Sequence, residues 1–453
     1  MRTRARTTGT TSAPTRRLLA IVLAAGIAAT GMPFASVVRA AGLVSFGATT
    51  IRSTFQIGID VEEPVTLPAS VHRIEALVHT GSDTRVLADD VPIPAGAGPT
   101  NLTYHIQAPP GQLLPNTLVE VHFRVTLANG TTEEGPLASV RYEDTRFAWK
   151  TLAGTYVTVH WAQGDDAFGR RALQIGDKAV ADTSRLLGVT ETSPIDFYIY
   201  PDTKSFYDVL GPAARENVGG VAFPDIRTLL ANIGPDAVND AWVGTVIPHE
   251  LTHLVFGTAV DNPYHAPPHW FNEGLAVYLS QGYVSGDRSQ VANAVGDGSI
   301  MPLAALAGQF PTTADRFSLA YAESVSALDY LIRTYGQTAL VTLIHAWGGG
   351  VSDDDAFQSA LGVDVAGFQA GWLKAIGAPE PSPAGPKPAP PGPVPPGWPG
   401  GAAVVPGSVS SPSGGASATD LLVEGIAVVL IAFLAIGLLW FLARRRRRGT
   451  RPQ

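Results

Sequence analysis

The stretch VIPHELTHLV, residues 246–255, places two histidines and a glutamate inside a run that is otherwise mostly apolar. His249 and His253 are four positions apart, so on a helix both imidazoles lie on one face, one turn apart. Two imidazoles in this arrangement can bind one zinc ion, which takes neutral ring nitrogens at about 2.0–2.1 Å. Glu250 follows the first histidine and can take a proton from a water molecule held there, which is the chemistry of the H-E-x-x-H pattern.

Pro248 lies directly before this pattern. A proline inside a helix removes one backbone hydrogen bond and clashes with the carbonyl group four residues earlier, here that of Gly244. Two alternatives follow: either the helix tolerates a kink at this point, or it begins at Pro248.

A catalytic zinc site needs a third protein ligand and leaves its fourth position to water. A metzincin has glycine and histidine at the positions held here by Phe256 and Ala259, so that class is excluded. The stretch PPHWFNEGLAVYLSQ, residues 267–281, predicts a second helix after its two prolines. Glu273 lies in this helix, 20 positions after His253, and its carboxylate can complete a His/His/Glu set.

These two motifs together resemble the gluzincins, and most closely the peptidase MA-like family, in which HExxH is followed by a helix carrying W-x-N-E-G-L-A. The spacing is also similar to that of the thermolysin clan, and the resemblance covers about residues 146–377. It implies that His249, His253 and Glu273 bind Zn²⁺, which polarises the scissile carbonyl and lowers the pKa of water toward ~7. It also implies that Glu250 is the general base and then the proton donor to the leaving amine.

Gluzincins usually add a tyrosine or histidine that donates a hydrogen bond to the oxyanion. The resemblance makes Tyr321, in FSLAYAESVSALDYL, the candidate, on one helix face with Ser324. His345 is a weaker candidate and is expected to be a packing residue. His265 and His269 lie in the predicted loop before the Glu273 helix; of two alternatives, lining the cleft or serving as polar loop residues, we expect the second.

Two further family features bear on this chain. The thermolysin type has an aspartate four positions after the glutamate ligand, where it orients a ligand histidine. This chain has Val277 there, so the sequence does not identify that partner. Gluzincins also hold the peptide on an edge strand, for which Gly219–Ala222 and Arg227–Ile233 are alternatives.

The fold class predicted for the chain is α+β. Residues 41–145 are predicted to form an immunoglobulin-like β-sandwich of about seven short strands. In LVEVHFRVTLANGTT, residues 118–132, apolar residues alternate and Asn129-Gly130 predicts a hairpin turn. Residues 146–377 form the gluzincin-like domain, a small mixed sheet plus helices. Its predicted elements are strands at 156–161 and 195–200, a helix at 165–187 and a hairpin within 217–233.

The two ends of the chain have the character of targeting segments. Residues 1–40 are predicted to be a signal peptide, with Arg16 and Arg17 before an apolar run. Residues 378–420 are a Pro/Gly-rich linker. Residues 421–443 are a predicted transmembrane helix, uncharged from 425, and 444–453 a basic cytoplasmic tail. We therefore expect a single-pass protein of the cell membrane with its N-terminal domains outside the cell.

The composition excludes several partners. Residues 1–40 and 444–453 each contain six arginines and no acidic residue, so the remaining 19 basic residues face all 39 acidic ones. The middle of the chain therefore carries about −20 and would repel nucleic acid. The chain has no cysteine, which excludes disulfide partners and thiolate catalysis. The high alanine and glycine content is typical of a bacterial protein.

Two functional hypotheses follow. The first is a membrane-anchored extracellular zinc metallopeptidase that hydrolyses a peptide or protein substrate. The second is a cell-surface adhesion or scaffold protein, in which the β-sandwich binds the partner and the metal site is structural or degenerate.

Overall fold

The computed structural model describes residues 44–381, except 82–84, 213, 215–218 and 263–264. The predicted signal peptide, transmembrane helix and basic tail lie outside the described residues, as does the linker after residue 381. Within the described part of the chain, no helix combines the length and apolar character needed to cross a bilayer.

The N-terminal part consists of two antiparallel sheets. In one sheet β3 is central and pairs with β1, β2 and β6, and in the other β4 pairs with β5 and β7, which in turn pairs with β8 and β9. The strands are β1 (Ser45–Phe46), β2 (Thr50–Thr54), β3 (Gly58–Leu67), β4 (Val71–Thr80), β5 (Leu87–Asp90), β6 (Gly98–Gln107), β7 (Leu118–Leu127), β8 (Thr132–Glu134) and β9 (Ala138–Arg141). Apolar residues of both sheets, such as Ile59 of β3 and Phe123 of β7, belong to one buried core.

The alternation predicted for β7 is confirmed. Every second residue from Val119 to Leu127 is buried, and the residues between them are partly exposed. The predicted turn is also present, because Gly130 has φ of 83° and its N–H donates to the Leu127 carbonyl. A positive φ of this size favours glycine, which has no Cβ to clash with the backbone.

The C-terminal part begins with a mixed sheet, which confirms the α+β class. Its strand order is β10-β11-β12-β14-β13, with β11, β12 and β14 parallel and both edge strands antiparallel. The strands are β10 (Lys150–Ala153), β11 (Val157–Trp161), β12 (Ile195–Tyr200), β13 (Gly220–Phe223) and β14 (Thr228–Asn232). The predicted strands and hairpin are therefore confirmed. Of the two proposed edge strands, 219–222 overlaps the edge strand β13, whereas 227–233 is wrong because β14 is internal.

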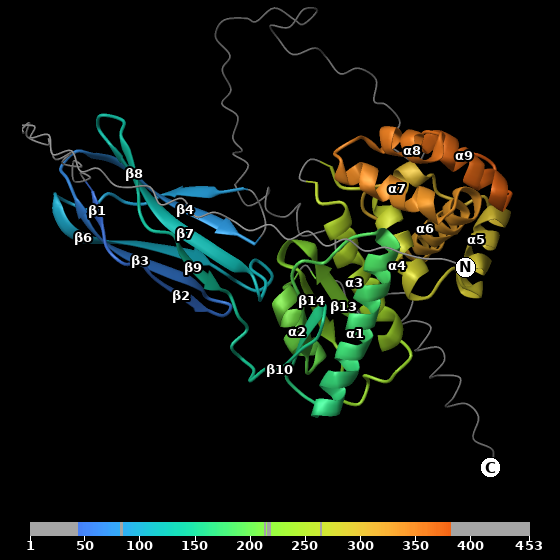
Figure 1. Ribbon diagram of the computed structural model, residues 1–453, viewed down its shortest axis with the longest axis horizontal. Helices are drawn as coiled ribbons and strands as arrows, with labels where there is room; N and C mark the ends of the chain where they lie inside the picture. The colour runs from blue at the N-terminus through green and yellow to red at the C-terminus, as the bar shows by residue number, and fades with distance from the viewer. Residues whose placement is uncertain (1–43, 82–84, 213, 215–218, 263–264, 382–453) are drawn as a thin grey trace, which may run out of the picture. The chain divides into compact units, whose positions relative to one another are not determined.

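Helices build the rest of this part: α1 and α2 lie between strands of the sheet in the sequence, and the others follow it (Figure 1). They are α1 (Asp166–Leu187), α2 (Thr203–Leu210), α3 (Val243–Ala259), α4 (His269–Ser280), α5 (Ser285–Asp297), α6 (Ala314–Tyr335), α7 (Gln337–Gly348), α8 (Asp353–Leu361) and α9 (Val365–Ile376), with 3₁₀ turns η1 (Pro224–Ile226) and η2 (Leu303–Leu306). The predicted helix α1 has Asp165 as its N-cap, which accepts from the Phe168 N–H. Helix α3 packs on α1 and β13, and α4 packs on α3 and α6.

Helix α3 resolves the question raised by Pro248. The helix begins at Val243 and continues through the proline, so the alternative that it begins at Pro248 is wrong. Gly244, whose carbonyl the proline ring faces, has open space where a side chain would be. The HExxH residues therefore lie in the middle of a helix that is packed between the sheet and α4.

Candidate active site

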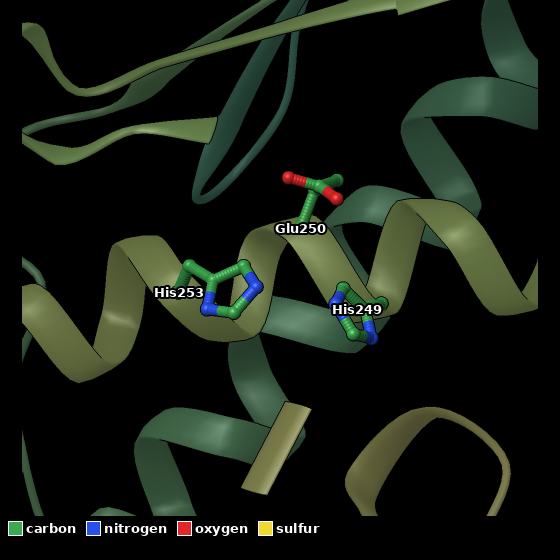
Figure 2. A group of neighbouring side chains, drawn as sticks. All are labelled: His249, Glu250 and His253. Atoms are coloured by element: carbon green, nitrogen blue, oxygen red, sulfur yellow. The ribbon is translucent and has the colours of Figure 1, made fainter. Parts of the chain in front are cut away.

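Three polar side chains of α3 come together in an apolar setting. Figure 2 shows His249 and His253 one turn apart, with Glu250 between them along the helix. All three are buried, with 8% exposure at most. One donor atom from each lies within 4.8 Å of the other two. Burying ionisable groups is costly unless they are paired or bind a metal, so this cluster needs a partner.

Helix α4 provides that partner as a second carboxylate. Glu273 Oε2 lies 3.4 Å from His249 Nε2 and 3.7 Å from His253 Nε2. Glu273 is itself buried, and within the described residues its Oε2 accepts no hydrogen bond. The structure thus brings together the four residues that the sequence selected, although they come from two helices.

These distances are those expected around a zinc ion. Ligand atoms at about 2.0–2.1 Å in a tetrahedral arrangement lie ~3.3 Å from one another. The separations of 3.4 and 3.7 Å between Glu273 Oε2 and the two ring nitrogens are close to this value. The donor set, two imidazole nitrogens and one carboxylate oxygen, is also one that zinc binds in proteins. The residues present therefore fit a zinc ion.

Glu250 is distinguished from Glu273 by its contacts. One of its oxygens accepts a hydrogen bond from the Ala222 N–H of the edge strand β13. The other, Oε2, is buried and has no hydrogen-bond partner among the described residues. Gly220 allows this approach, because a Cβ there would lie 3.2 Å from Glu250 Cγ. Glu250 therefore lies between the histidines and the strand edge and keeps one oxygen available.

Asn272 orients one of the two histidines. His253 Nδ1 lies 2.9 Å from Asn272 Oδ1. An amide oxygen only accepts hydrogen bonds, so Nδ1 carries the proton and the lone pair on Nε2 faces Glu273. Ligand histidines in metal sites usually donate their other N–H in this way. Asn272 thus fills the role for which the sequence, with Val277 in place of an aspartate, identified no residue.

The protonation states of the site follow from its burial. Burial raises the pKa of Glu250 well above its ordinary value, and the nearby charge of Glu273 raises it further. The hydrogen bond from the Ala222 N–H lowers this pKa, but its effect is smaller. Burial lowers the pKa of His253 despite the attraction of Glu273. For Glu273, burial opposes ionisation, but the imidazoles outweigh it and hold the pKa below its usual range. A neutral imidazole and an ionised carboxylate are the forms that bind metals.

The remaining candidates lie in different environments. Tyr321 is buried on α6, and its ring contacts Phe310; its role as oxyanion donor stays a prediction. His345 is exposed on α7, and its Nε2 donates a hydrogen bond to the Leu187 carbonyl oxygen at 2.7 Å. His265 lies in the loop before α4, as expected, and its Nε2 is 2.8 Å from Oδ1 of Asp353, the first residue of α8.

His269 differs from its prediction. It is the first residue of α4 and is buried, so its assignment as a polar loop residue is wrong. Pro268 forms the N-cap of α4, and this places His269 one turn before Glu273, with His269 Nε2 3.6 Å from Glu273 Oε1. The spacing H-x-x-x-E directly after a proline was the signal available in the sequence.

A cavity of about 420 Å³ opens beside the site. His253, Asn272 and His269 form one part of its wall, and apolar residues such as Phe256 and Val260 form much of the rest. Space next to a polar cluster of this kind is where a substrate side chain can bind.

In the α3 and α4 motifs, a buried HExxH sequence is thus joined by a glutamate on a following helix. Residues 175–378 match the model of the Peptidase MA superfamily. This part of the chain belongs to the gluzincin-type, peptidase MA-like family, as the sequence motifs indicated. The family assignment supports a metallopeptidase, which is a hydrolase.

Individual proteins show more distant similarity. Aminopeptidase M1-A of Oryza sativa subsp. japonica is 30% identical over 138 residues, which are 30% of this chain and 15% of that protein. A solved structure of an aminopeptidase N family protein from Idiomarina loihiensis is 11% identical, covers 73% of this chain and 76% of its own, and has a TM-score of 0.37. A DUF4466 family protein from Parabacteroides merdae has a TM-score of 0.16 with 13% identity, covering 25% of this chain and 48% of its own. TM-scores this low do not establish a shared overall fold.

Proposed function

We propose that the protein is a zinc-dependent metallopeptidase that hydrolyses peptide bonds in a peptide or protein substrate. The observation that carries this proposal is the convergence of His249, His253 and Glu273 on one buried point, with Glu250 beside it. The Peptidase MA match over residues 175–378 supports the same class of reaction.

The three converging residues would hold the zinc ion. When bound, zinc supplies a Lewis acid that polarises the scissile carbonyl and lowers the pKa of water. Asn272 keeps the His253 ring in the tautomer that presents Nε2. Because the two histidines belong to one helix and Glu273 to another, the packing of α3 on α4 sets the distance between the ligands.

Glu250 would act on protons. Its Oε2 is available to take a proton from the attacking water and to pass it to the leaving amine, which is the role of a general base and then a general acid. The Ala222 N–H fixes the other oxygen and so fixes the direction of the carboxylate. We propose Tyr321 as the donor that stabilises the oxyanion.

The edge strand β13 is proposed to bind the substrate backbone. Its one neighbour among the described strands is β14, and its Ala222 N–H points to Glu250. An extended peptide can add to such an edge by main-chain hydrogen bonds. A peptide bound there would lie next to the general base, as hydrolysis requires.

The proposal is tested with Glu250→Gln in the full chain. Gln keeps the size of the side chain but cannot accept the proton, so we expect turnover of unfolded casein to fall by roughly 10²–10⁴-fold. Zinc content, measured by inductively coupled plasma mass spectrometry, should stay at one ion per chain. A chelator should abolish wild-type turnover, and added zinc should restore it.

The matched control is Glu134→Gln, the same change at an exposed position of β8. It should cleave casein at the wild-type rate. Turnover that is equally fast in Glu250→Gln and wild type would refute the proposed mechanism.

One observation favours the second candidate, an adhesion or scaffold protein with a structural metal site. His269 lies near Glu273 and is a possible fourth protein donor, and structural zinc sites are closed by four protein ligands. X-ray absorption spectroscopy of the zinc-loaded chain counts these ligands. Three protein ligands plus water support the peptidase, and four support the structural site.

We also propose an immunoglobulin-like fold for the N-terminal part and a location at the cell membrane. The strand neighbours of β3 and β7 support an immunoglobulin-like sandwich for residues 41–145, because each central strand pairs with partners distant in sequence. The apolar run at 425–443, followed by arginines, supports a single-pass membrane anchor with the folded domains outside the cell.

A further inference from the structure

The carboxylate of Glu273 is approached from two sides. His249 and His253 face its Oε2, at 3.4 and 3.7 Å. His269 faces the other oxygen, with its Nε2 3.6 Å from Oε1. Three imidazoles thus surround one carboxylate, but only two of them share the oxygen that fits the zinc position.

His269 is fixed by contacts that involve neither α3 nor its histidines. Its backbone N–H donates to the Ala307 carbonyl at 2.8 Å. Its ring packs against Phe310, with centroids 4.6 Å apart, and Phe310 in turn packs against Tyr321. The ring is therefore held from the side of the 299–313 segment and α6, independently of the helix that carries HExxH.

The Nε2 atom of His269 is a buried polar atom that needs a partner. It makes no hydrogen bond within the described residues, and the atom it faces is Glu273 Oε1. A shift of about 0.6 Å would bring the two atoms to an ordinary hydrogen-bond distance of ~3.0 Å. One turn beyond Glu273 on the same helix, Val277 is apolar and offers no alternative donor.

We infer that His269 is a positioning residue: it donates from Nε2 to Glu273 Oε1, so that Glu273 presents Oε2 alone to the metal. This inference rests on the zinc site of the proposed function and names a further residue of that site. A carboxylate held at one oxygen loses its freedom to rotate before it binds, and partners of this kind strengthen metal binding 10–100-fold.

The test measures zinc affinity of the full chain, by competition with a chromophoric chelator, in three variants. His269→Phe keeps an aromatic ring against Phe310 but has no donor, so zinc should bind 10–100-fold more weakly than in the wild type. His269→Gln keeps an N–H donor on a side chain that can reach Oε1 and should bind zinc within about threefold of the wild type. His269→Leu has neither the ring nor the donor and should be as weak as Phe.

Cobalt(II) absorption adds a readout that packing does not change. A positioning residue is not itself a ligand, so cobalt-loaded His269→Phe should not have a lower coordination number than the wild type. A lower coordination number in this variant would make His269 a ligand and overturn the inference. Equal zinc affinity in His269→Phe and wild type would overturn it as well, as would loss of affinity that His269→Gln does not restore.

Failure of this inference is distinguishable from failure of the proposed function. Casein cleavage by the wild-type chain decides the function, whereas the affinity ratio of the variants decides the role of His269. A wild-type chain that binds zinc without cleaving refutes the peptidase and leaves the His269 inference to be decided by that ratio. A wild-type chain that binds no zinc overturns both.

Discussion

At the scale of single residues, three buried carboxylates of this chain have different chemistry because their surroundings differ. Glu273 faces imidazoles, and Glu250 faces one backbone N–H and keeps one oxygen available. Glu323, on α6, is fully buried, and both its oxygens accept from the Met301 N–H at 3.2 and 3.3 Å. Burial raises the pKa of Glu323 to about 8, against the opposing effects of that N–H and of Arg316. This carboxyl is therefore neutral in the folded chain at pH 7.

The raised pKa of Glu323 predicts a pH-dependent stability. In the unfolded chain the group releases its proton near its ordinary pKa of 4.5, but in the folded chain only near 8. Between these values the folded state binds more protons, so its stability is full below pH 4.5 and falls as pH rises to about 8. At about 1.4 kcal/mol per unit of pKa difference, the loss amounts to a few kcal/mol. Glu323→Gln, which stays neutral and can accept from Met301, should remove this loss.

Thermal unfolding between pH 5 and 9 measures the effect. The two chains should unfold at similar temperatures at pH 5, and Glu323→Gln should be the more stable chain at pH 9. Glu134→Gln, at an exposed position, should follow the wild type throughout. A difference in unfolding temperature between wild type and Glu323→Gln that stays constant with pH would contradict the raised pKa of Glu323.

The residues of the site were predictable where a local pattern carried them. His249, Glu250 and His253 lie within one turn of helix, and Glu273 belongs to a compact second motif. Asn272 was not identified as the partner of His253, because that contact depends on how two helices cross, 19 residues apart in sequence. Glu323 was not predicted either, since nothing local to a helical glutamate shows that the surrounding residues will bury it.

At the scale of elements, the close contact of α4 and α6 depends on one glycine. Gly274 directly follows Glu273, and a Cβ at this position would lie 2.6 Å from the Ser324 carbonyl oxygen and 2.8 Å from Leu328 Cδ2. The first of these atoms is backbone, so it cannot move aside by rotating a side chain. The glycine of the N-E-G motif therefore allows α6 to pack directly against the helix that carries the proposed third ligand.

Gly274→Ala tests this packing. Alanine favours a helix by about 1 kcal/mol over glycine, but the clash forces the two helices apart, and overpacking of this kind costs roughly 1–3 kcal/mol. We expect a lower thermal unfolding temperature and weaker zinc binding, because Glu273 moves with the helix. Gly296→Ala, in α5 where the space is open, should leave the unfolding temperature unchanged or raise it. If Gly274→Ala and Gly296→Ala unfold at the same temperature, the α4–α6 contact does not depend on the glycine at position 274.

The elements themselves followed from sequence where periodicity was strong. Strand β7 alternates strictly, and α1 has an aspartate cap at its start and a glycine at its end. Helix α3 was harder, because Pro248 suggested a possible start and the structure instead continues the helix through it. The proline is tolerated within α3 because the helix packs against α1 and α4. This tertiary packing outweighs the local preference of one residue.

At the scale of the whole molecule, charged residues and long apolar runs are unevenly distributed along the sequence. Both termini are basic, and the acidic residues lie between them. The acidic part between them repels the anionic surface of a lipid bilayer, so its attachment by surface charge is unfavourable. Membrane attachment of this part would then depend on hydrophobic insertion of another segment.

The apolar run at 425–443 is the segment proposed for that role. Its 19 residues span about 28 Å as a helix, close to the ~30 Å hydrocarbon core of a bilayer. The full chain, expressed in bacterial cells, should therefore stay in the membrane pellet after an alkaline carbonate wash. A chain ending at residue 420 should be released, and it should cleave casein at the same rate per molecule, because the residues of the proposed site, on β13, α3, α4 and α6, all precede residue 420. A shortened chain that remains in the washed pellet would show that the anchor lies elsewhere.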